Sequence, residues 1–271
     1  MFAGFMMSTW IVATMVAIVA GFIGFFVVIR RSAFAAHVLP LAAFPGAAAA
    51  NLLGANELLG LAVFSGLGVA GITQLGRRDR HEVATALSLV TLLALGTLFL
   101  SMTREYSQGV YALLFGDVLG ISTNQILPVA VLSVLAIATT GLFFRPLLLD
   151  SLSPELAAAS GRSTRLTQLL FLMVLALSTA MVLPVVGALL VFSLMVGPGS
   201  AARSLTDRPL AAALLSVCIS VVTVWVAIAL SYLSNWPVGF FVGVLSVVSY
   251  LAGRIYRRPG GAVRVGSNSS L

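Results

Sequence analysis

Lysine is absent from this chain, and charged residues of either sign are scarce. All fifteen basic residues are arginines, eight residues are acidic, and charged residues make up 8% of the 271 residues against 60% hydrophobic. A soluble domain cannot bury so large an apolar share, so the surrounding solvent must be lipid. The missing lysine also excludes a nucleotide-binding loop of the G-x-x-x-x-G-K-[ST] type. We therefore expect a polytopic membrane protein that does not bind ATP by that route.

Cysteine and catalytic motifs are equally scarce. The single cysteine, Cys218, lies in an apolar run, which excludes a disulfide framework and a cysteine-rich metal site and favours a small lipid- or helix-facing side chain. The sequence contains no HExxH motif, no carboxylate dyad and no arrangement of nucleophile and base. It therefore disfavours an intramembrane enzyme. Because the arginines lie between apolar runs, they indicate topology and not a nucleic-acid surface.

Apolar runs of about twenty residues recur along the chain. Backbone groups in hydrocarbon must be hydrogen-bonded internally, and solidly apolar runs indicate helices, because barrel strands would alternate. The predicted fold class is all-α, a membrane helical bundle over residues 1–258, followed by a polar tail at 259–271 whose composition is typical of disorder. Around Pro184 the sequence allows one kinked helix or two short ones. The nine expected spans are about 9–29, 36–55, 58–76, 83–102, 126–148, 166–183, 185–202, 210–233 and 237–256.

The arginines are distributed unequally between the two sets of loops that nine spans create. Fourteen fall in one set, and only Arg104 falls in the other. Arginine concentrates in cytoplasmic loops, so this split predicts an outer amino terminus and a cytoplasmic carboxyl terminus in the inner or plasma membrane of a prokaryote. The outer loop at 103–125 is long enough for a short interfacial helix.

One cytoplasmic loop carries the signals of a short helix over about 151–162. Ser153 suits the N-cap, Pro154 the first helical position and Glu155 the positive end of the helix dipole. Gly161 can adopt the left-handed conformation that ends a helix, and Leu156 is a candidate apolar anchor. Such a helix either docks into a groove on a partner or packs as a structural turn on its own bundle, and the residues alone leave both alternatives open.

The run from Leu152 to Gly161, with Pro154-Glu155-Leu156-Ala157 at its centre, resembles the cytoplasmic loop of ATP-binding-cassette (ABC) metal-ion permeases, the zinc/manganese/iron class. The similarity covers nearly the whole chain in order. Its other segments are Arg30–Gly46, Leu114–Leu119, Val185–Val191, Pro198–Arg203 and Trp236–Gly239.

This resemblance implies a permease subunit and not an enzyme. Such a subunit works as a homodimer with two copies of a separate ATPase, and it receives its ion from an extracytoplasmic binding protein. The resemblance assigns Ser153 to Gly161 as the coupling helix that docks on the ATPase. It implies no resident cofactor and no nucleic-acid partner, with a divalent metal ion, zinc or manganese, as the transported substrate. The missing nucleotide loop agrees, because the motor must then lie on another chain.

The predicted translocation pathway departs from the family pattern. The family carries an Asp and, four residues later, a His in its second helix, where this chain has His37 and Leu41. Imidazole is a reasonable ligand for zinc, but one histidine does not make a site. His37 could also be a neutral histidine bonded to a neighbouring helix. Asn51 and Glu57, near the outer end of the same helix, could line the pathway or merely cap helices.

Two alternative functions stay open. One is a permease of the same mechanism for a metal chelate, in the related siderophore and cobalamin class. The other is a carrier driven by an ion gradient, which usually places carboxylates within its spans. All eight acidic residues here fall at or near loops, which disfavours the carrier.

Overall fold

The computed structural model describes residues 4–75, 81–102, 123, 126–159, 161 and 163–256. In these ranges the chain forms helices joined by short turns. They are α1 (Gly4–Ile29), α2 (Ala33–Leu53), α3 (Glu57–Leu75), α4 (His81–Ser101), α6 (Ile126–Leu142), α7 (Phe144–Leu152), α8 (Pro154–Ala159), α9 (Thr164–Val186), α10 (Ala188–Leu205), α11 (Pro209–Ser234) and α12 (Val238–Tyr256).

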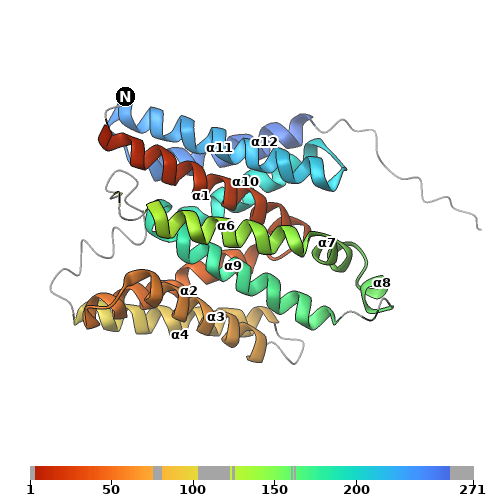
Figure 1. The fold of residues 1–271 in the computed structure, drawn as a ribbon, viewed down its shortest axis with the longest axis horizontal. Helices are drawn as coiled ribbons and strands as arrows, with labels where there is room; N and C mark the ends of the chain where they lie inside the picture. The colour runs from red at the N-terminus through yellow and green to blue at the C-terminus, as the bar shows by residue number, and fades with distance from the viewer. Residues whose placement is uncertain are drawn as a thin grey trace, which may run out of the picture.

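The long helices run alongside one another as one bundle (Figure 1). α1, α11 and α12 form one edge, and α2, α3 and α4 form the opposite edge, with α6, α9 and α10 between them. α1 contacts α6, α9, α10 and α11, while α2 contacts α3, α4, α9 and α10. The short helices α7 and α8 lie together at one end of the bundle (Figure 1).

This arrangement confirms the predicted all-α membrane bundle. Among the described residues, six helices are long and apolar enough to cross a membrane, and α6 with α7 makes a seventh if the bent pair is one span. Residues Ala86–Ser101 of α4 form a shorter apolar helix. Each of the nine predicted spans has a helical counterpart in the described chain.

One predicted span was wrong. The expected single helix at 126–148 is broken at Phe143, where α6 and α7 meet at an angle of 57°. Of the two alternatives around Pro184, the structure has two helices, and Gly187, with a φ of 86°, separates α9 from α10. A positive φ is unstrained in glycine but not in a side-chain-bearing residue, so the chain turns at the glycine and the proline is accommodated near the end of α9.

The buried core forms around α1. Phe25, Phe26 and Ile23 are fully buried there, together with Leu175 of α9 and Leu194 of α10. The helices approach closely where glycine removes the side chain, and a Cβ added at Gly24 would lie 2.0 Å from the backbone oxygen of Met195. α1 is therefore held tightly against α10 at the centre of the bundle.

Some predictions lie outside the described residues. They are the loop arginines at 77, 78 and 80, the interfacial helix expected in 103–125 (Thr123 apart) and the polar tail beyond 258.

Candidate functional site

The predicted cytoplasmic helix is present as α8, which spans Pro154–Ala159. Pro154 is its first residue, Glu155 lies in its first turn, and Gly161 has a φ of 74°. Ser153 is the only residue between α7 and α8, and its N–H donates to the carbonyl of Leu149 at 2.9 Å. Ser153 therefore ends α7 through its backbone N–H, directly before α8 begins. Its predicted N-cap position did not indicate this role at the end of α7.

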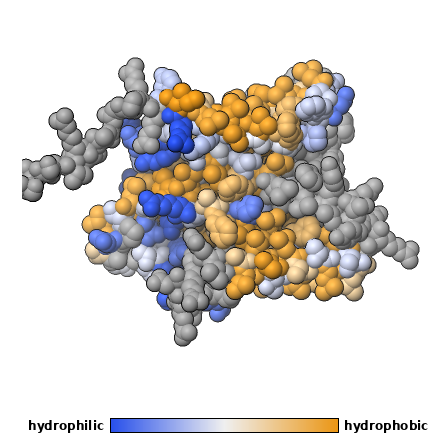
Figure 2. Space-filling view, turned by 180° about the vertical axis from the view of Figure 1, so that it is seen from behind, coloured by the Kyte–Doolittle hydropathy of each residue, from blue (hydrophilic) through white to orange (hydrophobic). Residues whose placement is uncertain are grey.

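The outer surface of α8 and of the segment before it is available to a partner. Leu156 is 62% exposed and Leu152 is 57% exposed, and Glu155 is exposed beside them. Much of the hydrophilic surface in Figure 2 lies at the end of the molecule that carries α7 and α8, whereas hydrophobic residues cover the broad flank. α8 thus presents an exposed apolar side chain next to an exposed carboxylate.

A buried ion pair joins α7 to the end of α1. The guanidinium of Arg30 lies 2.8 Å from the carboxylate of Asp150, and their side chains are only 9% and 8% exposed. Arg30 also donates to the carbonyl of Leu147 at 3.3 Å and to the hydroxyl of Ser151 at 3.4 Å. Its guanidinium carbon lies 5.0 Å from the ring centroid of Phe171 in α9. One arginine therefore connects the end of α1 to α7 and α9.

Sequence reasoning did not find this pair. Arg30 was read as a topology marker and Asp150 as a loop residue, and the two are separated by 120 positions. No local motif reports such a contact.

A polar cavity of about 620 Å³ opens beside the pair. The ends of α1, α7 and α10 and the start of α9 line this cavity. Its lining arginines are among those that the sequence predicts on one side of the membrane. The charged and polar residues that line it include Arg30, Arg31, Ser32, Asp150, Gln168 and Arg203.

His37 packs inside the bundle near the start of α2. Its ring stands edge-on to Phe192 of α10, with the ring centroids 5.2 Å apart at an interplanar angle of 76°. The Nδ1 atom is buried and has no hydrogen-bond partner among the described residues. Leu41, one turn further along α2, is buried in the apolar core. Among the described residues, Nδ1 is thus a buried ring nitrogen without a partner, which is chemically able to bind a cation.

The other predicted pathway residues lie far from His37. Asn51 is exposed near the opposite end of α2, about 21 Å away at 1.5 Å per residue. Its backbone oxygen accepts from the N–H of Gly54, and Asn56 accepts from the N–H of Leu58 at the start of α3, beside the exposed Glu57. Within the described part of the chain, no three His, Cys, Asp or Glu side chains gather as a metal site. A single chain therefore does not assemble these three residues around one ion.

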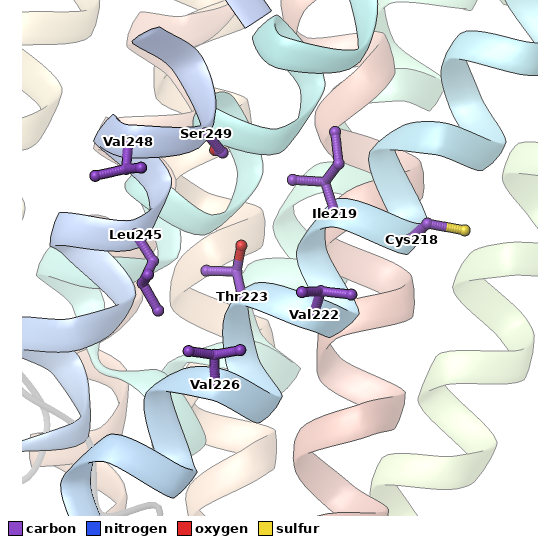
Figure 3. A pocket seen from close by; sticks show the side chains of 8 residues that line it. All are labelled: Cys218, Ile219, Val222, Thr223, Val226, Leu245, Val248 and Ser249. Atoms are coloured by element: carbon purple, nitrogen blue, oxygen red, sulfur yellow. The ribbon is translucent and has the colours of Figure 1, made fainter. Parts of the chain in front are cut away.

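A second cavity, of about 320 Å³, lies between α11 and α12 (Figure 3). Cys218, Ile219, Val222 and Val226 line it from α11, and Leu245 and Val248 are among the residues of α12 that close it. The lining carries neither a carboxylate nor an imidazole. Cys218 is exposed at this groove, and its prediction as a lipid- or helix-facing side chain stays a prediction. The groove is suited to apolar contact and unsuited to a divalent ion.

Comparisons with known proteins point to one family. The model of the ABC 3 transport family matches residues 3–257. The manganese transport system membrane protein MntC of Listeria innocua is 27% identical over 252 residues, which cover 92% of this chain and 90% of that protein. MntC of Halalkalibacterium halodurans is 30% identical over 199 residues, with coverages of 72% and 68%.

A solved structure shares the same fold. A chain of the complex described as PsaBC from Streptococcus pneumoniae with Fab superposes with a TM-score of 0.86, at 22% identity and 94% coverage of both chains. At this identity the likeness is one of fold.

Proposed function

Because the chain belongs to the ABC 3 transport family, whose model matches residues 3–257, we propose that it is the membrane permease of an ATP-driven importer of divalent metal ions, with manganese as the first candidate. The observation that carries this proposal is the match to the family over almost the full length. The exposed helix α8, in the loop that resembles the family's coupling segment, supports it. Relatives named for manganese transport support the choice of ion.

The motor is a separate ATPase. The chain has no lysine for a nucleotide-binding loop, so the energy of ATP must reach it through a protein contact. α8, with the exposed Leu156, is the proposed point of contact. A second copy of the permease and an extracytoplasmic protein that delivers the ion complete the proposed assembly.

The test of this function is uptake by a purified complex. The permease, co-expressed with an ATPase subunit of the same family of importers and reconstituted in vesicles, should accumulate radioactive manganese when ATP and a loaded binding protein are supplied. Zinc and iron serve as competing ions, and a chelated ion tests the metal-chelate alternative. ATP hydrolysis without uptake of any of these ions would defeat the proposal.

The proposed topology has nine spans, an outer amino terminus and α8 in the cytoplasm. The structure supports one-sided placement of these arginines, because Arg31, which follows α1, and Arg203, in the last turn of α10, line the same cavity. Single cysteines at Ser153 and Ser234, in a Cys218→Ser background, provide the check. An impermeant thiol reagent should label intact cells at position 234 and not at 153. The reverse pattern would invert the orientation.

His37 is the proposed pathway residue of this chain nearest the cytoplasm. If its free nitrogen meets the ion, His37→Ala should lower manganese uptake about tenfold, as the loss of a metal-orienting group does, while the complex still assembles. The matched control is Phe192→Leu, which removes the aromatic contact and keeps the imidazole. Unchanged uptake in His37→Ala would make His37 a packing residue. Asn51 and Glu57 remain predictions for the outer end of the path.

A further inference from the structure

The helix that leads into α8 is attached to α1 at two points. At the first, Phe144 at the start of α7 lies against Phe22, Phe25 and Phe26 of α1, with ring centroids 5.2 to 6.3 Å apart. The second is the ion pair between Arg30 and Asp150 near the end of α7. The two contacts thus hold α7 against α1 near both of its ends.

The two attachments differ in kind. The aromatic contact is apolar and weakly directional, so it tolerates sliding. The ion pair is directional, because the planar guanidinium is shared among the carboxylate of Asp150, the carbonyl of Leu147 and the hydroxyl of Ser151, with Phe171 against it. It therefore sets the angle of α7 on α1, and through Ser153 the direction in which α8 leaves the bundle.

Stability alone does not explain the pair. Removing two charges from water costs free energy. Replacing a buried ion pair by apolar residues of similar volume therefore often leaves the stability of the folded protein unchanged or raises it. What an apolar pair lacks is directional geometry.

We propose that Arg30 and Asp150 are positioning residues for energy coupling, which join α8 to α1 so that movement of the docked ATPase is transmitted into the bundle. The inference rests on the proposed function. It adds to the proposed contact surface on α8 a second element, the ion pair between Arg30 and Asp150, through which force on α8 reaches α1. From α1 the movement reaches α10 through the close contact of Gly24 with Met195.

The experiment compares transport with hydrolysis in the reconstituted complex. Asp150→Asn weakens the pair, and the double variant Arg30→Met with Asp150→Leu replaces it by apolar side chains without leaving an unpaired charge. In both variants we expect the ATPase to stay bound and ATP hydrolysis to continue, while manganese ions moved per ATP fall about tenfold, within the usual range of coupling between sites.

Matched controls are Arg145→Met, an exposed arginine on the same helix α7, and Asp207→Asn, whose carboxylate is fully exposed. Both should keep the wild-type ratio. A merely structural pair would be replaceable, so a wild-type ratio in the apolar double variant would overturn the inference. Loss of the ATPase from that variant would overturn it too, because the pair would then serve assembly. A wild-type complex that hydrolyses ATP and moves no metal would instead defeat the proposed function itself.

Discussion

Replacing Leu156 by aspartate is expected to release the ATPase from the permease and abolish ATP-driven uptake. Leu156 is 62% exposed on α8, so the bundle does not need its side chain, whereas a docked partner would bury it. A carboxylate placed unpaired in such a contact costs about 3 kcal/mol, which lowers the affinity for the ATPase about a hundredfold. The measurement is the amount of ATPase retained on the purified permease, with uptake followed in parallel.

The control for this substitution is Leu233→Asp. Leu233 is also exposed, but it lies near the end of α11 that the proposed topology places outside the cell. It should leave ATPase retention unchanged. If Leu156→Asp retains the ATPase and transports at wild-type level, α8 is a connector and the motor docks elsewhere.

Gly24→Ala is expected to destabilise the bundle strongly. The added Cβ would lie 2.0 Å from the backbone oxygen of Met195 and 2.8 Å from its carbonyl carbon. Backbone cannot rotate away as a side chain can, so α1 and α10 must separate along their contact. Overpacking of this kind costs about 3 kcal/mol. The variant should melt at a clearly lower temperature than the wild type in the same detergent.

Gly66→Ala is the control that separates the clash at Gly24 from the general effect of replacing glycine by alanine within a helix. Beyond the backbone of its own helix, no atom of the described residues lies within 4 Å of a Cβ at Gly66, and alanine favours a helix over glycine by up to about 1 kcal/mol. Gly66→Ala should therefore be neutral or slightly stabilising. A Gly24→Ala variant as stable as the wild type would mean that the two helices are less closely packed than the structure has them.

The local signals in the sequence were the reliable ones. Apolar runs located the helices because a span in lipid must be apolar along its whole length, whatever it packs against. Pro154 and Gly161 located α8 because proline suits a first helical position and glycine a positive φ, and both preferences act within a few residues. The helix breaks near Phe143 and Pro184 also have local causes. Pro146 lies in the first turn of α7, where a missing N–H is tolerated, and Gly187 supplies the positive φ after α9.

The sequence by itself determined that this chain is a helical membrane protein of the ABC 3 transport type with a short helix between two of its spans, since composition, length of apolar runs and order of motifs are properties of the chain alone. Only the tertiary structure decided which residues meet. It paired Arg30 with Asp150 and placed Gly24 against Met195. In a bundle, side chains more than 100 positions apart meet through the crossing of helices, which depends on all the contacts at once and leaves no local pattern.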